Sequence, residues 1–127
     1  MAPAAGAAAL AAAGWWGRPW WARVAGASMA PLLPEGSWIL ATDGRGRPPL
    51  GAVVVAVHPQ RPGMELVKRV AAVDADRGLV WLSGDNAAAS TDSETFGPVR
   101  VDAIRGRVRL RLRPWPPRVV PADPGRL

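Results

Sequence analysis

Proline and glycine interrupt this chain so often that few stretches could form a long helix. Fourteen prolines and fourteen glycines are spread over 127 residues. Proline breaks the interior of a helix and glycine weakens it, whereas both residues are ordinary in turns. A chain of this length also has room for only one domain with a modest core. The sequence therefore predicts a compact, turn-rich, all-β domain.

Short apolar runs separated by turns support this fold class. The expected strands cover residues 38–41, 52–57, 64–73, 79–83 and 104–112. The continuous β-branched run at 52–57 is typical of a buried strand. Arginines alternate with apolar residues over 104–112, which indicates a half-buried strand. We expect Arg107, Arg109 and Arg111 to lie on its solvated outer face, and residues 84–98 to form a polar loop.

Shifts in composition divide the chain into three parts. Residues 1–22 are an Ala- and Trp-rich leader, residues 23–117 the predicted domain, and residues 118–127 an irregular tail. The apolar run of the leader ends at Arg18 and Pro19, short of the roughly 20 residues that cross a bilayer. We therefore expect no transmembrane helix. Trp15, Trp16, Trp20 and Trp21 would suit a helical or interfacial segment at a membrane, or would cover an apolar edge of the domain.

Charge and the lack of cysteine exclude several function classes. Without Cys there is no disulfide or thiolate site, and one histidine, His58, cannot build a zinc site. We predict no metal and no cofactor. The net charge of +6 favours an anionic surface as partner, although arginine-rich composition explains it equally well. No helix-turn-helix pattern precedes residue 24, so we expect no nucleic-acid partner.

Lys68 is the only lysine of the chain, beside fifteen arginines. Arginine supplies a fixed positive charge, whereas lysine can also lose its proton. On the strand expected at 64–73, Lys68 shares a face with Leu66 and Val70, and Arg69 points away. Lowering a lysine pKa from about 10.4 to about 7 requires roughly 4.6 kcal/mol, which burial supplies and a surface position does not. Lys68 is therefore a candidate general base, unless it is an ordinary surface lysine.

Three motifs lie in order along the chain: Gly26-Ala27-Ser28-Met29-Ala30-Pro31, then Lys68-Arg69-Val70, then a stretch from Gly84-Asp85-Asn86 through Ser90 and Asp92-Ser93 to Gly97. Together they resemble the boxes of type I signal peptidases, which read G-x-S-M-x-P, K-R-V and G-D-N…S-x-D-S-R…G. The resemblance extends from about Val24 to Trp115. It implies a coiled β-sheet domain that hydrolyses peptides through an acyl-enzyme.

The resemblance assigns roles to named residues of this chain. Ser28 would be the nucleophile, with its backbone N–H in the oxyanion hole, and Lys68 the general base. Ser90 would orient the Lys68 amine and Asp92 would brace its loop. Gly26 and Asp85 join the supporting set. The substrate would lie extended against strands, with small side chains near the scissile bond.

Two positions depart from the common family pattern. Many members have a serine where this chain has Gly26, and loss of such an oxyanion donor can reduce catalysis by about 10²–10³-fold. Glu94 stands where the family usually has an arginine that pairs with the preceding Asp. These departures keep open an inactive peptide-binding module of the same fold.

Only 39 residues separate Ser28 from Lys68, which leaves no room for a large inserted cap domain. This compact layout is similar to the nickel-type superoxide dismutase maturation proteases, which trim a leader from the dismutase precursor. Residues 23–31 and 112–117 also resemble the second catalytic subunit of the mitochondrial inner membrane protease. We therefore expect a leader-removing serine endopeptidase, either cytoplasmic or peripherally membrane-associated. A self-cleaving repressor shares the Ser/Lys pair, but it would need a DNA-binding segment.

Overall fold

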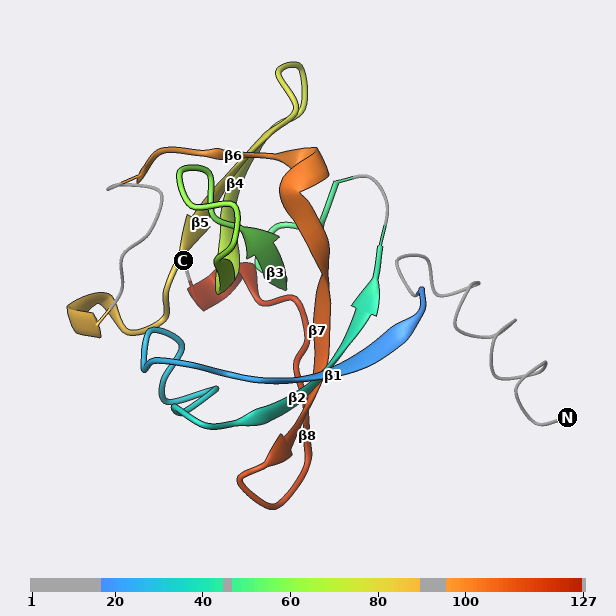
Figure 1. Cartoon of the computed structure of the whole chain (residues 1–127), viewed down its shortest axis with the longest axis vertical. Coiled ribbons are helices and arrows are strands. Elements are labelled where there is room, and N and C mark those ends of the chain that lie inside the picture. Colours follow the sequence, from blue (N-terminus) through green and yellow to red (C-terminus); the bar gives the residue numbers. More distant parts are fainter. Residues whose placement is uncertain (1–16, 45–46, 90–95, 127) are drawn as a thin grey trace, which may run out of the picture.

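The computed structural model describes residues 17–44, 47–89 and 96–126. Their regular elements are strands and short 3-10 turns, so the predicted all-β class is confirmed (Figure 1). The elements are β1 (Pro19–Arg23), β2 (Trp38–Asp43), β3 (Val53–Val57), β4 (Glu65–Asp74), β5 (Leu79–Ser83), η1 (Ala87–Ala89), β6 (Val99–Arg100), η2 (Val101–Ala103), β7 (Ile104–Arg113), β8 (Arg118–Val119) and η3 (Pro124–Arg126).

One antiparallel sheet contains all these strands. Its order is β1-β2-β7-β3-β4-β5-β6, and β8 pairs with β7. The sheet curls into a half-barrel, so its strands surround the interior in Figure 1. Two apolar clusters fill the core, one around Val54, Val70 and Leu82 and the other around Met29 and Val108. Each expected apolar run forms one of the longer strands β2, β3, β4, β5 or β7, so the predicted strands are confirmed.

Both ends of the predicted domain extend further than composition indicated. Residues 19–22, placed in the leader, form most of β1 and pair with β2. At the other end, Arg118 and Val119 form β8 against β7, and Val120 is buried in the core, so the first residues of the predicted tail are ordered parts of the domain. No helix in the described part of the chain has the length and apolar character needed to cross a membrane.

The tryptophans of the predicted leader have different environments. Trp15 and Trp16 lie outside the described residues. Trp20 is half-buried on β1 and packs against the core, where its ring lies directly over Gly106 of β7. Trp21, the next residue, points away from that core and is 57% exposed. Trp20 thus covers an apolar edge of the domain, whereas Trp21 lies on its surface.

The prediction that the arginines of residues 104–112 lie on a solvated face is wrong for Arg109 and Arg111. Arg109 and Arg111 are both buried. The reason is the position of β7 in the middle of the sheet, paired with β2 along one edge and with β3 and β8 along the other. Arg109 Nε donates to Thr42 Oγ1 at 3.2 Å. Burial, and then the charge of Arg107, lowers the pKa of Arg109 to about 10, and burial also lowers the pKa of Arg107.

Candidate active site

Ser28 lies in a tight segment between β1 and β2. Gly26 begins this segment with φ of +79°, a left-handed conformation that side chains other than glycine adopt rarely. Met29 is fully buried and anchors the turn in the core. The Leu33 N–H donates to the Met29 carbonyl at 2.8 Å, which closes the segment into a compact turn. The small residues around Ser28 thus allow a sharp bend that presents the serine at its edge.

Lys68 lies on β4, with Val54 of β3 as its register partner. Leu66 and Val70 are buried in one apolar cluster beside it, as the alternation of this strand predicted. The Lys68 side chain is only 4% exposed. Burial disfavours the ammonium form of lysine, so desolvation at this position acts toward the neutral amine.

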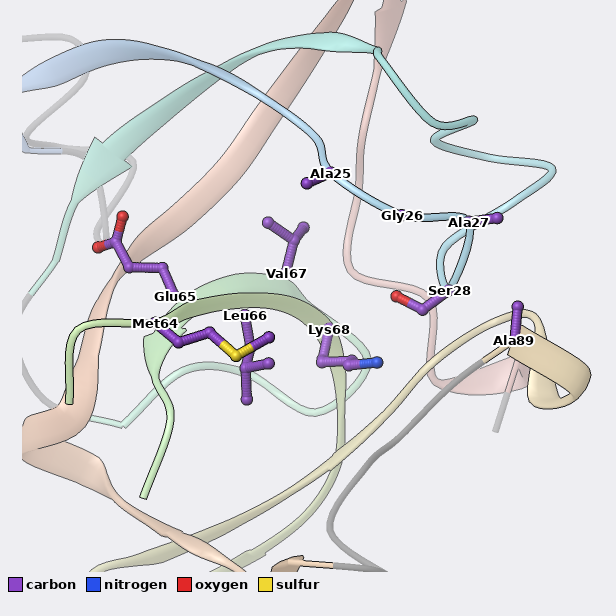
Figure 2. A pocket seen from close by; sticks show the side chains of 10 residues that line it. All are labelled: Ala25, Gly26, Ala27, Ser28, Met64, Glu65, Leu66, Val67, Lys68 and Ala89. Atoms are coloured by element: carbon purple, nitrogen blue, oxygen red, sulfur yellow. The ribbon is translucent and has the colours of Figure 1, made fainter. Parts of the chain in front are cut away.

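Ser28 and Lys68 line one pocket of about 230 Å³. Figure 2 shows the two side chains projecting from facing walls, Ser28 from the segment after β1 and Lys68 from β4. The other lining residues are small or apolar except for one carboxylate: Ala25, Gly26, Ala27, Met64, Glu65, Leu66, Val67 and Ala89. The pocket therefore has room for small side chains next to the serine hydroxyl.

Arg69, the residue after Lys68, forms a buried ion pair with Asp85. Arg69 Nε donates to Asp85 Oδ1 at 2.8 Å, and Nη2 donates to Oδ2 at 2.7 Å. The third donor, Nη1, reaches the Gly51 carbonyl at 2.8 Å. The side chains of the pair are 2% and 5% exposed. Strand alternation predicts that Arg69 points away from the Lys68 face, as an ion pair with Asp85 requires, but it predicts no partner for Asp85. The opposite charges of the second and third motifs were the available signal for this pair.

The Arg69–Asp85 ion pair lies next to the loop residue that bonds the Ser28 segment. Asn86 follows Asp85, and its backbone N–H donates to the Ser28 carbonyl at 2.8 Å. The Asn86 side-chain Nδ2 donates to the Ala27 carbonyl at 3.1 Å. Arg69 is the neighbour of Lys68 on β4, so one chain of contacts joins the lysine strand to the serine segment. Among the described residues, no acceptor pairs with the Ser28 N–H.

Within the described ranges, part of β4 beside the pocket has a partner strand on one edge only. Residues 65–69 pair with β3, whereas the β4–β5 pairing begins at Arg69. The Met64 and Val70 backbones both bond toward the β3 side. Because direction alternates along an antiparallel ladder, the backbone groups of Glu65 and Val67 point to the open edge. This edge lies along the pocket and can accept an extended peptide.

The structure does not describe two of the predicted site residues. Ser90, Asp92 and Glu94 are outside the described residues. His58 is in the turn after β3, where its Nδ1 accepts a hydrogen bond from the Gln60 N–H at 3.0 Å and its ring packs against Phe96. His58 is not among the residues that line the Ser28 pocket.

Comparisons with known proteins agree with this geometry. Residues 1–78 match the family described as signal peptidase, peptidase S26. The mitochondrial ATP-independent inner membrane protease subunit 1a of Arabidopsis thaliana is 36% identical over 118 residues, which cover 74% of this chain and 69% of that protein. The mitochondrial inner membrane protease subunit 2 of Danio rerio is 30% identical over 81% of this chain and 70% of its own length.

A third relative, the mitochondrial inner membrane protease subunit 1 of Xenopus tropicalis, is 37% identical over 52% of this chain. The chain spans about half the length of that protein and of its human and mouse counterparts. The family match includes the Ser28 and Lys68 motifs, and relatives of both subunit types extend over most of the chain. The chain belongs to the signal peptidase family, peptidase S26.

Proposed function

We propose that this protein is a serine endopeptidase that removes an N-terminal leader from a precursor protein, with Ser28 as nucleophile and Lys68 as general base. The observation that carries this proposal is the pocket that Ser28 and Lys68 line from facing walls (Figure 2). The burial of Lys68 supports it, because a general base must be neutral before it can accept a proton.

The reaction has two halves that use the same pair of side chains. The neutral Lys68 amine takes the Ser28 hydroxyl proton while Oγ attacks the scissile carbonyl carbon. The resulting tetrahedral intermediate collapses, the C–N bond breaks, and the leaving amine takes the proton from the Lys68 ammonium. Lys68 then takes a proton from water, whose oxygen attacks the ester. Collapse releases the leader carboxyl group and returns the proton to Ser28.

The oxyanion of each intermediate would accept a hydrogen bond from the Ser28 backbone N–H, which has no acceptor among the described residues. Gly26 has no hydroxyl to add as a second donor. The positive φ of Gly26 is a backbone conformation that a serine at this position would adopt only with strain. Ser90 would orient the Lys68 amine and Asp92 would brace that loop, as the family resemblance implies.

The open edge of β4 would bind the leader as an added strand. The Glu65 and Val67 backbone groups would bond the peptide on one side, and the segment Ala25–Ala27 faces it across the pocket. Small residues line the end near Ser28, so small leader side chains would fit closest to the cleaved bond. This arrangement recognises an extended, unfolded segment, which a leader is.

Two classes of precursor are candidate substrates. The compact layout supports the nickel-type superoxide dismutase precursor as substrate. The inner membrane protease subunits among the relatives support a precursor of the kind a mitochondrial or secretory leader peptidase processes. A peripheral membrane contact would suit the second class. The exposed Trp21 and Trp38, with Arg23 as the register partner of Trp38, support such a contact.

The test is incubation with one precursor of each class and mass measurement of the new N-terminus. We expect one defined cleavage by the wild-type protein and none by Ser28→Ala. Cleavage of the dismutase precursor alone, or of the secretory-type precursor alone, identifies the substrate class. Tight binding of both precursors without cleavage would instead identify a peptide-binding module and contradict the enzymatic proposal. Release from membranes by mild salt would confirm peripheral attachment.

A further inference from the structure

A second cavity, of about 300 Å³, lies on another part of the domain. It is lined by Pro31, Leu32, Arg111 and Arg118, and it shares no lining residue with the Ser28 pocket. Arg111 is on β7 and Arg118 on β8, the short strand beside it (Figure 1). Two arginines are therefore the polar side chains of this cavity, and neither has a role in the proposed peptidase reaction.

Arg111 is a buried cation that forms an ion pair with no carboxylate of the residues that the structure describes. It is 8% exposed. Its Nη1 donates to the Leu32 carbonyl at 3.1 Å and its Nη2 to the Pro116 carbonyl at 3.4 Å. Its Nε is buried and has no hydrogen-bond partner in the described part of the chain. Among the described residues, carboxylates pair with Arg69, Arg77, Arg100 and Arg105 instead.

Arg118 adds a second positive charge directly opposite the first. Arg111 and Arg118 are register partners in the β7–β8 pair. Like charges at directly opposed positions of an antiparallel pair destabilise it. A buried charge without a counter-ion also carries a desolvation penalty that neutral carbonyl acceptors offset only in part. Both costs fall if an anion occupies the cavity between the two guanidinium groups.

We propose that Arg111 and Arg118 form a binding site for a phosphate-type oxyanion. Guanidinium groups match the geometry of phosphate oxygens and form charge-assisted hydrogen bonds with them. Each Nη of Arg111 keeps one hydrogen that is not used by the Leu32 or Pro116 carbonyl. The exposed Arg118 completes the site from the solvent side. The oxyanion is either free phosphate or the phosphate of an anionic lipid headgroup.

The site is close in sequence to the proposed nucleophile. Pro31 and Leu32 come three and four residues after Ser28, in the turn that Met29 anchors. Because Arg111 holds the Leu32 carbonyl, an anion bound there stabilises the same turn. The proposal itself does not depend on peptidase activity, so it is tested by binding alone.

The test is thermal unfolding of the full chain at constant ionic strength, with sodium chloride replaced stepwise by inorganic phosphate. We expect a saturable rise in Tm for the wild type. The exposed Arg118 allows a mild variant: Arg118→Gln should weaken the apparent phosphate affinity roughly tenfold, the effect of one lost charge-assisted hydrogen bond. Arg118→Lys should keep most of the affinity. Arg77→Gln, in the exposed turn between β4 and β5, is the matched control and should change nothing.

A second measurement distinguishes the two sources of phosphate. Sedimentation with phosphatidylglycerol vesicles that inorganic phosphate and Arg118→Gln both reduce would identify a lipid headgroup. Saturable phosphate binding without vesicle binding would identify the free ion. A Tm that rises without saturation, or that rises equally in the wild type and in Arg118→Gln, would overturn the proposal, because phosphate then acts only as a general stabilising salt.

Discussion

The backbone N–H of Asn86 donates a 2.8 Å hydrogen bond to the carbonyl of Ser28, and the Asn86 side chain holds the Ala27 carbonyl at 3.1 Å. These bonds fix the peptide on both sides of the proposed nucleophile. Asn86 is thus a positioning residue, since it acts on the reaction through the Ser28 backbone.

Asn86→Ala keeps the backbone bond and removes the one to Ala27. We expect kcat for leader cleavage to fall roughly tenfold while KM changes little, because the loss affects the placement of Oγ in the transition state more than peptide binding. Steady-state kinetics on a leader peptide, with a thermal unfolding curve for each protein, provide the check. An unchanged kcat would show that the Ser28 turn is held without Asn86.

The Arg69–Asp85 pair should contribute strongly to stability because both partners are buried. Asp85→Ala leaves the Arg69 cation without a counter-ion, and we expect the free energy of unfolding to fall by about 3–5 kcal/mol. The double variant Arg69→Met with Asp85→Leu removes both charges and should recover most of that loss. Urea denaturation measures each value.

The matched control is Asp102→Asn, which breaks the exposed pair with Arg100. It should change the free energy of unfolding by less than about 1 kcal/mol. Equal effects of Asp85→Ala and Asp102→Asn would mean that burial of the Arg69–Asp85 pair has no energetic consequence.

The sequence predicted the strands and singled out Ser28 and Lys68, which line one pocket, but it did not predict the contacts between distant segments. Strand periodicity is local, so runs such as 79–83 appeared in the structure with the predicted bounds. The burial of Arg109 and Arg111 depends on which strands flank β7, and alternation along one strand carries no information about its neighbours. The Arg69–Asp85 pair joins positions 16 residues apart across two strands, which is beyond the reach of a periodic pattern.

Substitution of Gly106 tests how the Trp20 side chain of β1 packs over β7. A Cβ at this position would overlap the ring of Trp20 and the carbonyl of Thr42. We expect Gly106→Ala to reduce the free energy of unfolding by about 1–3 kcal/mol, because Trp20 must move off the core. Gly63→Ala is the control, since nothing lies within 4 Å of its added Cβ. If chemical denaturation gave the same stability for both variants, the close contact between Trp20 and β7 would be incorrect.

Glu65 should select for positive charge in the leader. Its carboxylate lines the Ser28 pocket and is paired with Arg105 at 3.1 Å in an exposed ion pair. Exposed pairs of this kind contribute less than about 1 kcal/mol, so a basic leader residue can compete for the carboxylate. Peptides with Lys, Gln or Glu at each of the four positions before the cleaved bond should show a Lys preference of roughly three- to fivefold in kcat/KM at one position.

Two variants separate charge selection from general activity at this position. Glu65→Gln should abolish the Lys preference and leave cleavage of the neutral peptide near the wild-type rate. Arg105→Gln removes the competing cation and should increase the preference. An unaltered Lys preference in Glu65→Gln would assign the selection to another residue, without affecting the roles of Ser28 and Lys68.

We propose that Lys68 acts as a neutral amine that accepts the Ser28 proton, and the most direct test of this role is the cleavage rate of Lys68→Arg on a leader peptide. Arginine keeps the positive charge but does not become a neutral base, and Lys68→Met provides a neutral control of similar length. With both variants folded by circular dichroism, we predict that kcat/KM falls at least about 10³-fold in each. Cleavage by Lys68→Arg at the wild-type rate would contradict the Ser28–Lys68 mechanism.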